Sequence, residues 1–193
     1  KYFGVGWTKV YLEKMCEFYS RISDTKYTAV RHTNIYGPFD KYDLDKSHFL
    51  GATITKVLTT DDNPPAGPLR RSDSEASEAG KIVVWGDGSE ERDLLYVSDL
   101  VDFIEIVLRK QKVPFELINI GLGQAYSVKD VVGKIIEVSG KKIMLEFDPS
   151  QPTIKFNLAV NTQKARKKYN WKPKTTLEAG IKKTISWYRE NFL

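Results

Sequence analysis

The sequence contains a single cysteine, Cys16, among its 193 residues. One cysteine excludes a disulfide bond within the chain and any zinc cluster built from cysteine thiolates. It is consistent with a reducing compartment, and we expect the protein to be cytoplasmic and to hold no metal ion.

Long hydrophobic runs are also lacking. No apolar run approaches the ~20 residues that a membrane-spanning helix needs. The start of the chain shows no apolar segment of the kind that directs secretion. We therefore expect a chain without a membrane span or a signal peptide.

Signatures of nucleic-acid binding are absent, although the net charge is +5 and the sequence pI is about 9.1. No zinc finger, RNA-binding motif or basic stretch interleaved with aromatic residues occurs. Much of the positive charge lies in residues 163–168 and in Lys172, Lys174, Lys182 and Lys183, which we interpret as solvated helix faces. A small ligand that carries phosphate explains the charge equally well, and nucleic acid is the weakest of the three interpretations.

No strand of the sequence is followed by the Gly-x-x-Gly-x-x-Gly turn that places a pyrophosphate at a helix N-terminus. Gly4-Val5-Gly6 is too short and has no strand before it. Gly121-Leu122-Gly123 follows a predicted strand but has no third glycine. We therefore expect the dinucleotide cradle to lie outside this chain.

What the chain does contain is a globular balance of residues, with 41% hydrophobic and 28% charged. Segments with helical and strand-like periodicity alternate, which predicts an α/β fold. Gly37-Pro38 marks a turn over 34–38, Ser98 or Asp99 should cap the helix that follows them, and Ser127-x-x-Asp130 resembles a capping box. The predicted helices are 7–23, 47–58, one from 98 or 99 onward, 128–138, 161–169 and 177–191; the predicted strands are 27–31, 81–85, 94–97, 115–120 and 143–147; residues 61–80 are expected to form an exposed loop.

Four short segments follow one another along the chain: GWTK at 6–9, RHTNIYGP at 31–38, VWGDG at 84–88 followed by Arg92, and YVSDL at 96–100. Their order and spacing resemble those of extended short-chain dehydrogenase/reductases. Within that superfamily, Ser47-His48-Phe49 before a helix resembles GDP-fucose synthases. The tail over residues 161–180 is similar to the ending that the wider superfamily shares.

The resemblance covers essentially the whole chain and implies an α/β fold. This fold would be the C-terminal part of a Rossmann-type extended short-chain reductase, with its small mixed α/β substrate-binding domain. Residues 1–38 would end the NAD(P)-binding domain, whose N-terminal half is absent, and residues 39–193 would form mostly the substrate-binding domain. Residues 94–120 would return a helix and a strand to the Rossmann sheet. Such reductases commonly dimerise through a four-helix bundle, so we expect a homodimer in which the 7–23 helix takes part.

The resemblance further implies an epimerase/reductase that acts on a nucleotide-sugar with NADP or NAD, bound with the help of the missing half. Lys9 matches the lysine of the family's Tyr-x-x-x-Lys pair, which lowers the pKa of the tyrosine and holds the nicotinamide ribose. Asn34 and Ile35 match positions beside the nicotinamide, and Asn34 also faces the sugar.

The tyrosine of that pair is replaced by Val5, which carries no titratable proton. Three explanations remain open: Tyr2 reaches the site from an irregular turn, another acid or a less demanding reaction is used, or activity is lost. Tyr11 does not have the i, i+4 relation to Lys9 that would place both side chains on one helical face. A non-catalytic nucleotide-sugar-binding or scaffold protein is therefore the alternative function.

The remaining candidate residues face the substrate. His48 matches the histidine that protonates carbon during epimerisation in the resembling synthases, a task that suits an imidazole. Arg92 matches the arginine that grips the sugar nucleotide's phosphates through a charged, bidentate fork. Lys56 and Trp85 are expected to contribute further contacts to the substrate. The plainer alternatives are a capping histidine and surface charges.

Overall fold

The computed structural model describes residues 3–61, 80–151, 153 and 157–193. Its helices and strands alternate along the chain, as the sequence predicts. In order they are α1 (Phe3–Tyr19), β1 (Tyr27–His32), β2 (Asn34–Tyr36), α2 (Phe49–Thr59), β3 (Lys81–Trp85), β4 (Glu91–Tyr96), α3 (Val97–Lys110), β5 (Phe115–Ile120), β6 (Ala125–Ser127), α4 (Val128–Ser139), β7 (Met144–Asp148), β8 (Asn157–Leu158), α5 (Gln163–Tyr169) and α6 (Leu177–Phe192).

The strands pair mostly in parallel. β1 pairs with β5 from Tyr27↔Phe115 to His32↔Ile120, and β3 pairs with β7. β4 is the centre of a further sheet, with β2 and β8 parallel to it and β6 antiparallel. The predicted turn over 34–38 is therefore wrong at its start, because Asn34–Tyr36 is the strand β2. The reversal begins at Gly37, whose φ of 143° suits glycine.

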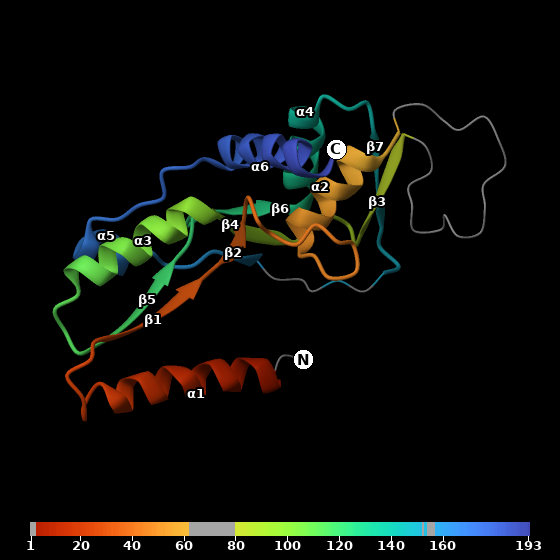
Figure 1. Cartoon of the computed structure of the whole chain (residues 1–193). Coiled ribbons are helices and arrows are strands. Elements are labelled where there is room, and N and C mark those ends of the chain that lie inside the picture. Colours follow the sequence, from red (N-terminus) through yellow and green to blue (C-terminus); the bar gives the residue numbers. More distant parts are fainter. Residues whose placement is uncertain (1–2, 62–79, 152, 154–156) are drawn as a thin grey trace.

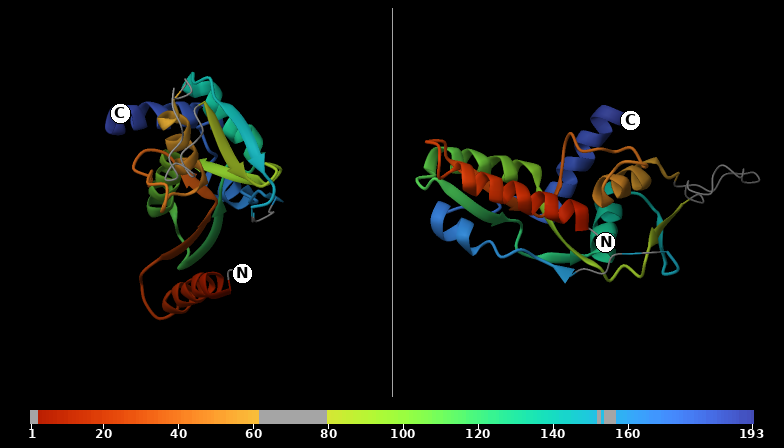
Figure 2. Two further views of the ribbon diagram at one scale, coloured as in Figure 1. Left: turned by 90° about the vertical axis from the view of Figure 1, so that its right-hand side faces the viewer. Right: turned by 90° about the horizontal axis from the view of Figure 1, so that it is seen from below.

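The helices lie on two sides of the β1–β5 pair. α3 and α5 cover one side, whereas α1 lies on the other (Figure 1). The left view of Figure 2 shows α1 set apart from the rest of the chain. None of its 17 residues is buried, and Trp7 keeps 60% of its surface exposed. A bidentate ion pair from Arg31 to Glu13, with N–O distances of 2.7 and 2.6 Å, ties α1 to β1.

Two hydrophobic clusters form the core. The larger one joins β2 and β4 to α2, α4 and α6, with Tyr36, Ile54 and Ile181 at its centre. The smaller one lies under α3 and α5, where the Phe103 ring meets Trp171 at a centroid distance of 5.2 Å. Burial of these faces explains why the amphipathic helices form where their periodicity predicts them.

The basic helix α5 is more than a solvated face. Lys164 donates to the buried carboxylate of Glu116 at 2.6 Å, and Lys168 and the Tyr169 hydroxyl bond to the same carboxylate. Burial alone would raise the pKa of Glu116, but these hydrogen bonds outweigh it and hold the pKa below its ordinary value. The interpretation of residues 163–168 as purely solvated therefore needs correction for Lys164 and Lys168.

Helix caps agree only in part with the expected ones. Ser127 caps α4, because its hydroxyl accepts a hydrogen bond from the Asp130 amide at 3.0 Å. The expected cap of α3 is wrong, since the helix begins at Val97 and no side chain caps it. Asp99 lies in the first turn and is buried. Its carboxylate instead binds the connection between α5 and α6.

Candidate functional site

Two of the predicted substrate contacts, Asn34 and Arg92, lie on the neighbouring strands β2 and β4. Asn34 opens β2 opposite Leu94, and its side-chain amide donates to the backbone carbonyl of Asp93 at 3.1 Å. Arg92 precedes that carbonyl on β4, is half-buried and donates to the Glu91 carbonyl at 3.0 Å. The Asn34 side chain therefore binds β4 one residue after Arg92.

The other predicted residues lie on separate elements. Lys9 is exposed on α1, and His48 is exposed at the N-cap position of α2 without a side-chain capping bond. Lys56 is half-buried in the last turn of α2, and Trp85 ends β3 with 59% of its surface exposed. Among the described residues, no side-chain hydrogen bond or ion pair links Lys9, His48 or Lys56 to another of these candidates.

The residues expected near the nicotinamide also lie on separate elements. Ile35 is half-buried and packs against the smaller hydrophobic cluster, next to Asn34 in the sequence. Tyr2 lies outside the described residues. Val5 is on α1 with 59% of its surface exposed, so the position that should carry the tyrosine has room for a larger side chain.

Three tyrosines near the β2–β4 junction are poor replacements for that missing acid. Burial is the main cause that raises the pKa of Tyr36, Tyr42 and Tyr96 above the ordinary value. Tyr36 donates to the Leu177 carbonyl at 3.4 Å and Tyr42 to the Gly37 carbonyl at 2.8 Å. These phenols therefore keep their protons near neutral pH and serve packing.

A buried aspartate, which the sequence reasoning missed, organises the turn after β5. Asp93 is fully buried, and its carboxylate accepts hydrogen bonds from the amides of Leu122 at 2.8 Å and Gly123 at 3.0 Å. The Thr33 hydroxyl and the Val160 amide also donate to it, at 3.2 and 3.3 Å. The sequence did contain a signal for this role: Asp93 stands directly before the apolar run Leu94-Leu95-Tyr96. An acidic residue in a buried strand needs hydrogen-bond partners.

The same contacts show that Gly121-Leu122-Gly123 does not fit a dinucleotide pyrophosphate. Two amides that could face phosphate oxygens are already bound to the Asp93 carboxylate. A Cβ at Gly121 would meet side-chain atoms of Val160 at 2.6 Å and Thr33 at 2.7 Å, so close internal packing explains this glycine. The turn Gly121-Leu122-Gly123 is therefore not a pyrophosphate cradle.

Asp99 holds a second connection in place. Its carboxylate accepts hydrogen bonds from the amides of Lys174 at 2.9 Å and Thr175 at 3.1 Å. Asp99 belongs to the segment 96–100 that carries the family resemblance, and Asp93 directly follows Arg92. They act as positioning residues, since each joins β4 or α3 to a chain segment that is distant in sequence.

No helix in the described ranges is long and apolar enough to cross a membrane. Likewise, no group of three or more histidine, cysteine, aspartate or glutamate side chains among those residues is arranged to hold a metal ion.

Comparison with known proteins identifies the family. Residues 6–121, more than half of the chain, match the NAD dependent epimerase/dehydratase family. The chain is 32% identical over 190 residues to a GDP-L-colitose synthase of Yersinia pseudotuberculosis, covering 96% of this chain and 56% of that protein. It is 32% identical to a probable GDP-L-fucose synthase 1 of Oryza sativa subsp. japonica, covering 93% of this chain and 50% of the relative.

Among solved structures, the UDP-glucose 4-epimerase of Thermotoga maritima superimposes with a TM-score of 0.75 at 25% identity, over 96% of this chain and 52% of that one. The chain belongs to the NAD dependent epimerase/dehydratase family and has the α/β fold of its extended reductases and epimerases. It spans about half the length of the curated relatives that it matches. The predicted resemblance to GDP-fucose synthases is thereby confirmed.

Proposed function

We propose that this chain supplies the sugar-nucleotide side of an NADP- or NAD-dependent nucleotide-sugar epimerase/reductase similar to GDP-fucose synthase. The observation that carries the proposal is that the Asn34 amide on β2 donates to the Asp93 carbonyl of β4, one residue after Arg92. A guanidinium offers a permanently charged, bidentate fork for phosphate oxygens, and an amide beside it can bind a further oxygen. The relatives named above support a GDP-sugar as the substrate.

In this proposal the chain comprises the same parts that the resemblance implies. Residues 1–38 would end the NAD(P)-binding domain, residues 39–193 would be mostly the substrate-binding domain, and 94–120 would return α3 and β5 to the Rossmann sheet. The parallel pairing of β1 with β5 supports this division, since it joins the two segments assigned to the Rossmann sheet.

The remaining roles are assigned by the resemblance. Lys9 would contact the nicotinamide ribose, and His48 would donate a proton to carbon during epimerisation. Asn34 and Ile35 would lie at the nicotinamide end. Lys56 and Trp85 would complete the substrate side. When bound, the cofactor would supply the hydride transfer that no protein side chain can provide.

The test is isothermal titration of the full-length protein with GDP, NADPH and NADH, repeated with this chain alone. We expect GDP and one of the dinucleotides to bind the full-length protein, and neither dinucleotide to bind the chain tightly. Arg92→Ala should weaken GDP binding by roughly 10- to 100-fold, because a hydrogen bond to a charged group contributes about 1.5–3 kcal/mol. Arg109→Ala is the matched control, since Arg109 is exposed on α3 and pairs only locally with Glu105. Equal affinities of the two variants, or no binding of GDP or of any dinucleotide, would refute the proposal.

The second candidate function is a nucleotide-sugar-binding or scaffold protein without catalysis, and Val5 favours it. Because Val5 is exposed on α1, Val5→Tyr should fold normally and place a phenol four residues before Lys9. Turnover of a GDP-4-keto-6-deoxy sugar that appears only in Val5→Tyr would support this candidate. Robust turnover by the parent protein would end it.

We further propose that the protein is a homodimer in which α1 packs against a partner. Val10 and Tyr19 on α1 expose 37% and 43% of their surface. Burying such side chains stabilises association by about 25 cal/mol per Å² of apolar surface. Sedimentation velocity of the full-length protein should show a dimer that Tyr19→Glu converts to monomer, and a monomeric parent would contradict this.

A further inference from the structure

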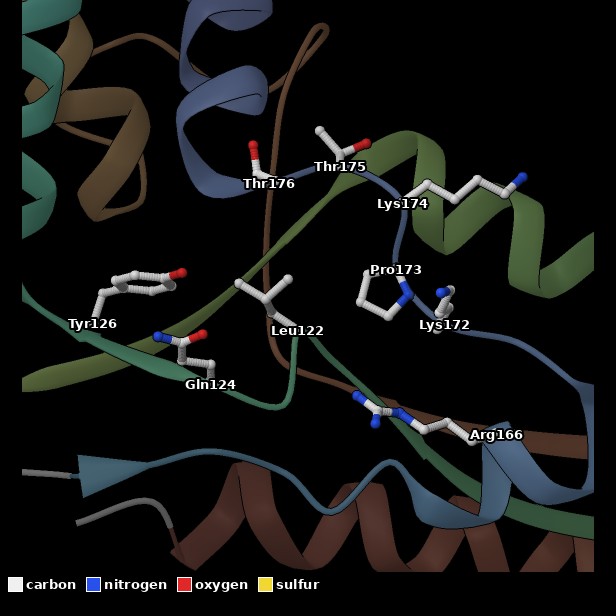
Figure 3. Close-up of a pocket in the computed structure, with 9 residues that line it drawn as sticks. All are labelled: Leu122, Gln124, Tyr126, Arg166, Lys172, Pro173, Lys174, Thr175 and Thr176. Atoms are coloured by element: carbon white, nitrogen blue, oxygen red, sulfur yellow. The ribbon is translucent and has the colours of Figure 1, made fainter.

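A pocket of about 270 Å³ lies between two segments that no predicted role uses (Figure 3). One wall is residues 122–126, which lead from β5 into β6. The other is residues 172–176, which connect α5 to α6, and Arg166 of α5 lies at the lower edge of the view. None of the proposed substrate or cofactor contacts lines it.

The pocket is positively charged, and two of its cations are available. Lys174 points away from the pocket in Figure 3, and its ammonium group pairs with Asp102 at 2.6 Å. Arg166 directs its guanidinium towards Leu122 and Gln124. Within the described part of the chain, no hydrogen bond or ion pair is made by the side chain of Arg166 or of Lys172. No acidic residue lines the pocket, so nothing there neutralises these two charges.

The neutral groups in the pocket limit what it can bind. The Lys174 and Thr175 amides are held by Asp99, so these two backbone donors are not free for a ligand. A ligand would instead meet the Gln124 amide, the Tyr126 hydroxyl and the Thr175 hydroxyl. Such groups suit the hydroxyls of a sugar, because each can donate and accept hydrogen bonds.

The volume of about 270 Å³ favours a ligand smaller than a complete nucleotide-sugar. Pockets for drug-sized ligands occupy about 300–1,000 Å³, and this one falls just below that range. A guanidinium and an ammonium group together match the two negative charges of a phosphate monoester better than the single charge of a carboxylate.

We propose that the pocket between residues 122–126 and 172–176 binds a phosphate monoester of a small sugar. Arg166 and Lys172 bind the phosphate, and Gln124, Tyr126 and Thr175 contact the sugar hydroxyls. This assignment uses none of the residues proposed to bind nucleotide-sugar or cofactor, and Tyr126, the strand partner of Arg92, is where the two sites adjoin.

The test is isothermal titration of the protein with glucose 6-phosphate, inorganic phosphate and glucose at fixed low ionic strength. We expect glucose 6-phosphate to bind, with glucose and inorganic phosphate each at least about tenfold weaker, since each retains only part of the contacts. The double variant Arg166→Gln/Lys172→Gln should weaken glucose 6-phosphate binding by at least about tenfold. Lys167→Gln, which removes a neighbouring exposed charge on α5, should leave binding unchanged.

Three results would overturn the proposal: no binding of glucose 6-phosphate, equal binding of inorganic phosphate, or an equal effect of Lys167→Gln. Both groups of variants are at exposed positions of α5 and the connection, so circular dichroism should show folded proteins. Gln124→Ala provides an independent check, because it should reduce the preference for glucose 6-phosphate over inorganic phosphate without removing a charge. GDP binding measured on the same samples should be unaffected by all of these changes, which separates this site from the one at Arg92.

Discussion

Replacing Asp93 tests whether a buried carboxylate, rather than glycine flexibility, shapes the turn after β5. Asp93 has no exposed surface and accepts four hydrogen bonds, from Leu122, Gly123, Thr33 and Val160. Asp93→Ala removes every acceptor while the donors stay buried. We therefore expect a large loss of stability.

The magnitude follows from the two shortest bonds. The Leu122 and Gly123 amides lie 2.8 and 3.0 Å from the carboxylate, and a buried donor without a partner costs about 1–3 kcal/mol. Partial access of water to the new cavity offsets some of this, so we expect Asp93→Ala to lower the free energy of unfolding by roughly 3–5 kcal/mol. Asp93→Asn keeps one acceptor but turns an NH₂ group towards a donor, and about half that loss is expected.

Urea unfolding followed by circular dichroism measures these losses, with Asp24→Ala as the control at an exposed loop position. Amide hydrogen exchange gives a second readout, because a general loss of stability would not speed exchange at this turn alone. Leu122, Gly123 and Val160 should exchange faster in Asp93→Asn than the amides of α4 do. If Asp93→Ala costs less than about 1 kcal/mol, or resembles Asp24→Ala, the carboxylate does not hold this turn.

Three further perturbations test the packing around the site. The unfolded chain protonates Glu116 near its ordinary pKa of about 4.3, whereas the folded chain does so at lower pH. The free energy of unfolding should therefore fall as the pH drops through that range, and urea titrations of Glu116→Gln should show a weaker pH dependence. Neither carboxylate oxygen of buried Glu90 has a hydrogen-bond partner among the residues that the structure describes. Glu90→Gln should therefore raise stability at pH 7 by roughly 1–3 kcal/mol, and a loss would contradict this. A Cβ at Gly180 would lie 2.1 Å from the Tyr36 hydroxyl, so Gly180→Ala should destabilise the folded protein by roughly 1–3 kcal/mol in thermal unfolding. The control is Gly133→Ala: its Cβ would meet nothing within 4 Å, and it should stabilise the protein by about 0.5–1 kcal/mol.

The sequence by itself determined those elements whose signals are local. The strands β3 and β5 have the predicted bounds, because runs of apolar and β-branched residues end at glycines. The helix α4 begins after its Ser127 cap, as the capping-box pattern predicts. The family resemblance was also visible in the sequence, because it depends on the order of short motifs. Both packing and chemistry constrain the residues of these motifs.

Only the tertiary structure decided the short strands and the roles of the buried acids. β2, β6 and β8 have two or three residues each and form because β4 offers them backbone partners, as Asn34 shows by pairing with Leu94. Strands this short carry no periodic signal of their own.

The same reason applies to Asp93 and Asp99. Their carboxylates bind amides that lie 29 to 76 positions away in the sequence, and no local pattern reports such a contact. The pocket beside residues 172–176 has the same origin, because residues 122–126, which are distant in the sequence, meet that segment there. Sequence periodicity therefore determined which helices and longer strands form, whereas long-range hydrogen bonding decided how their ends are joined around the candidate site.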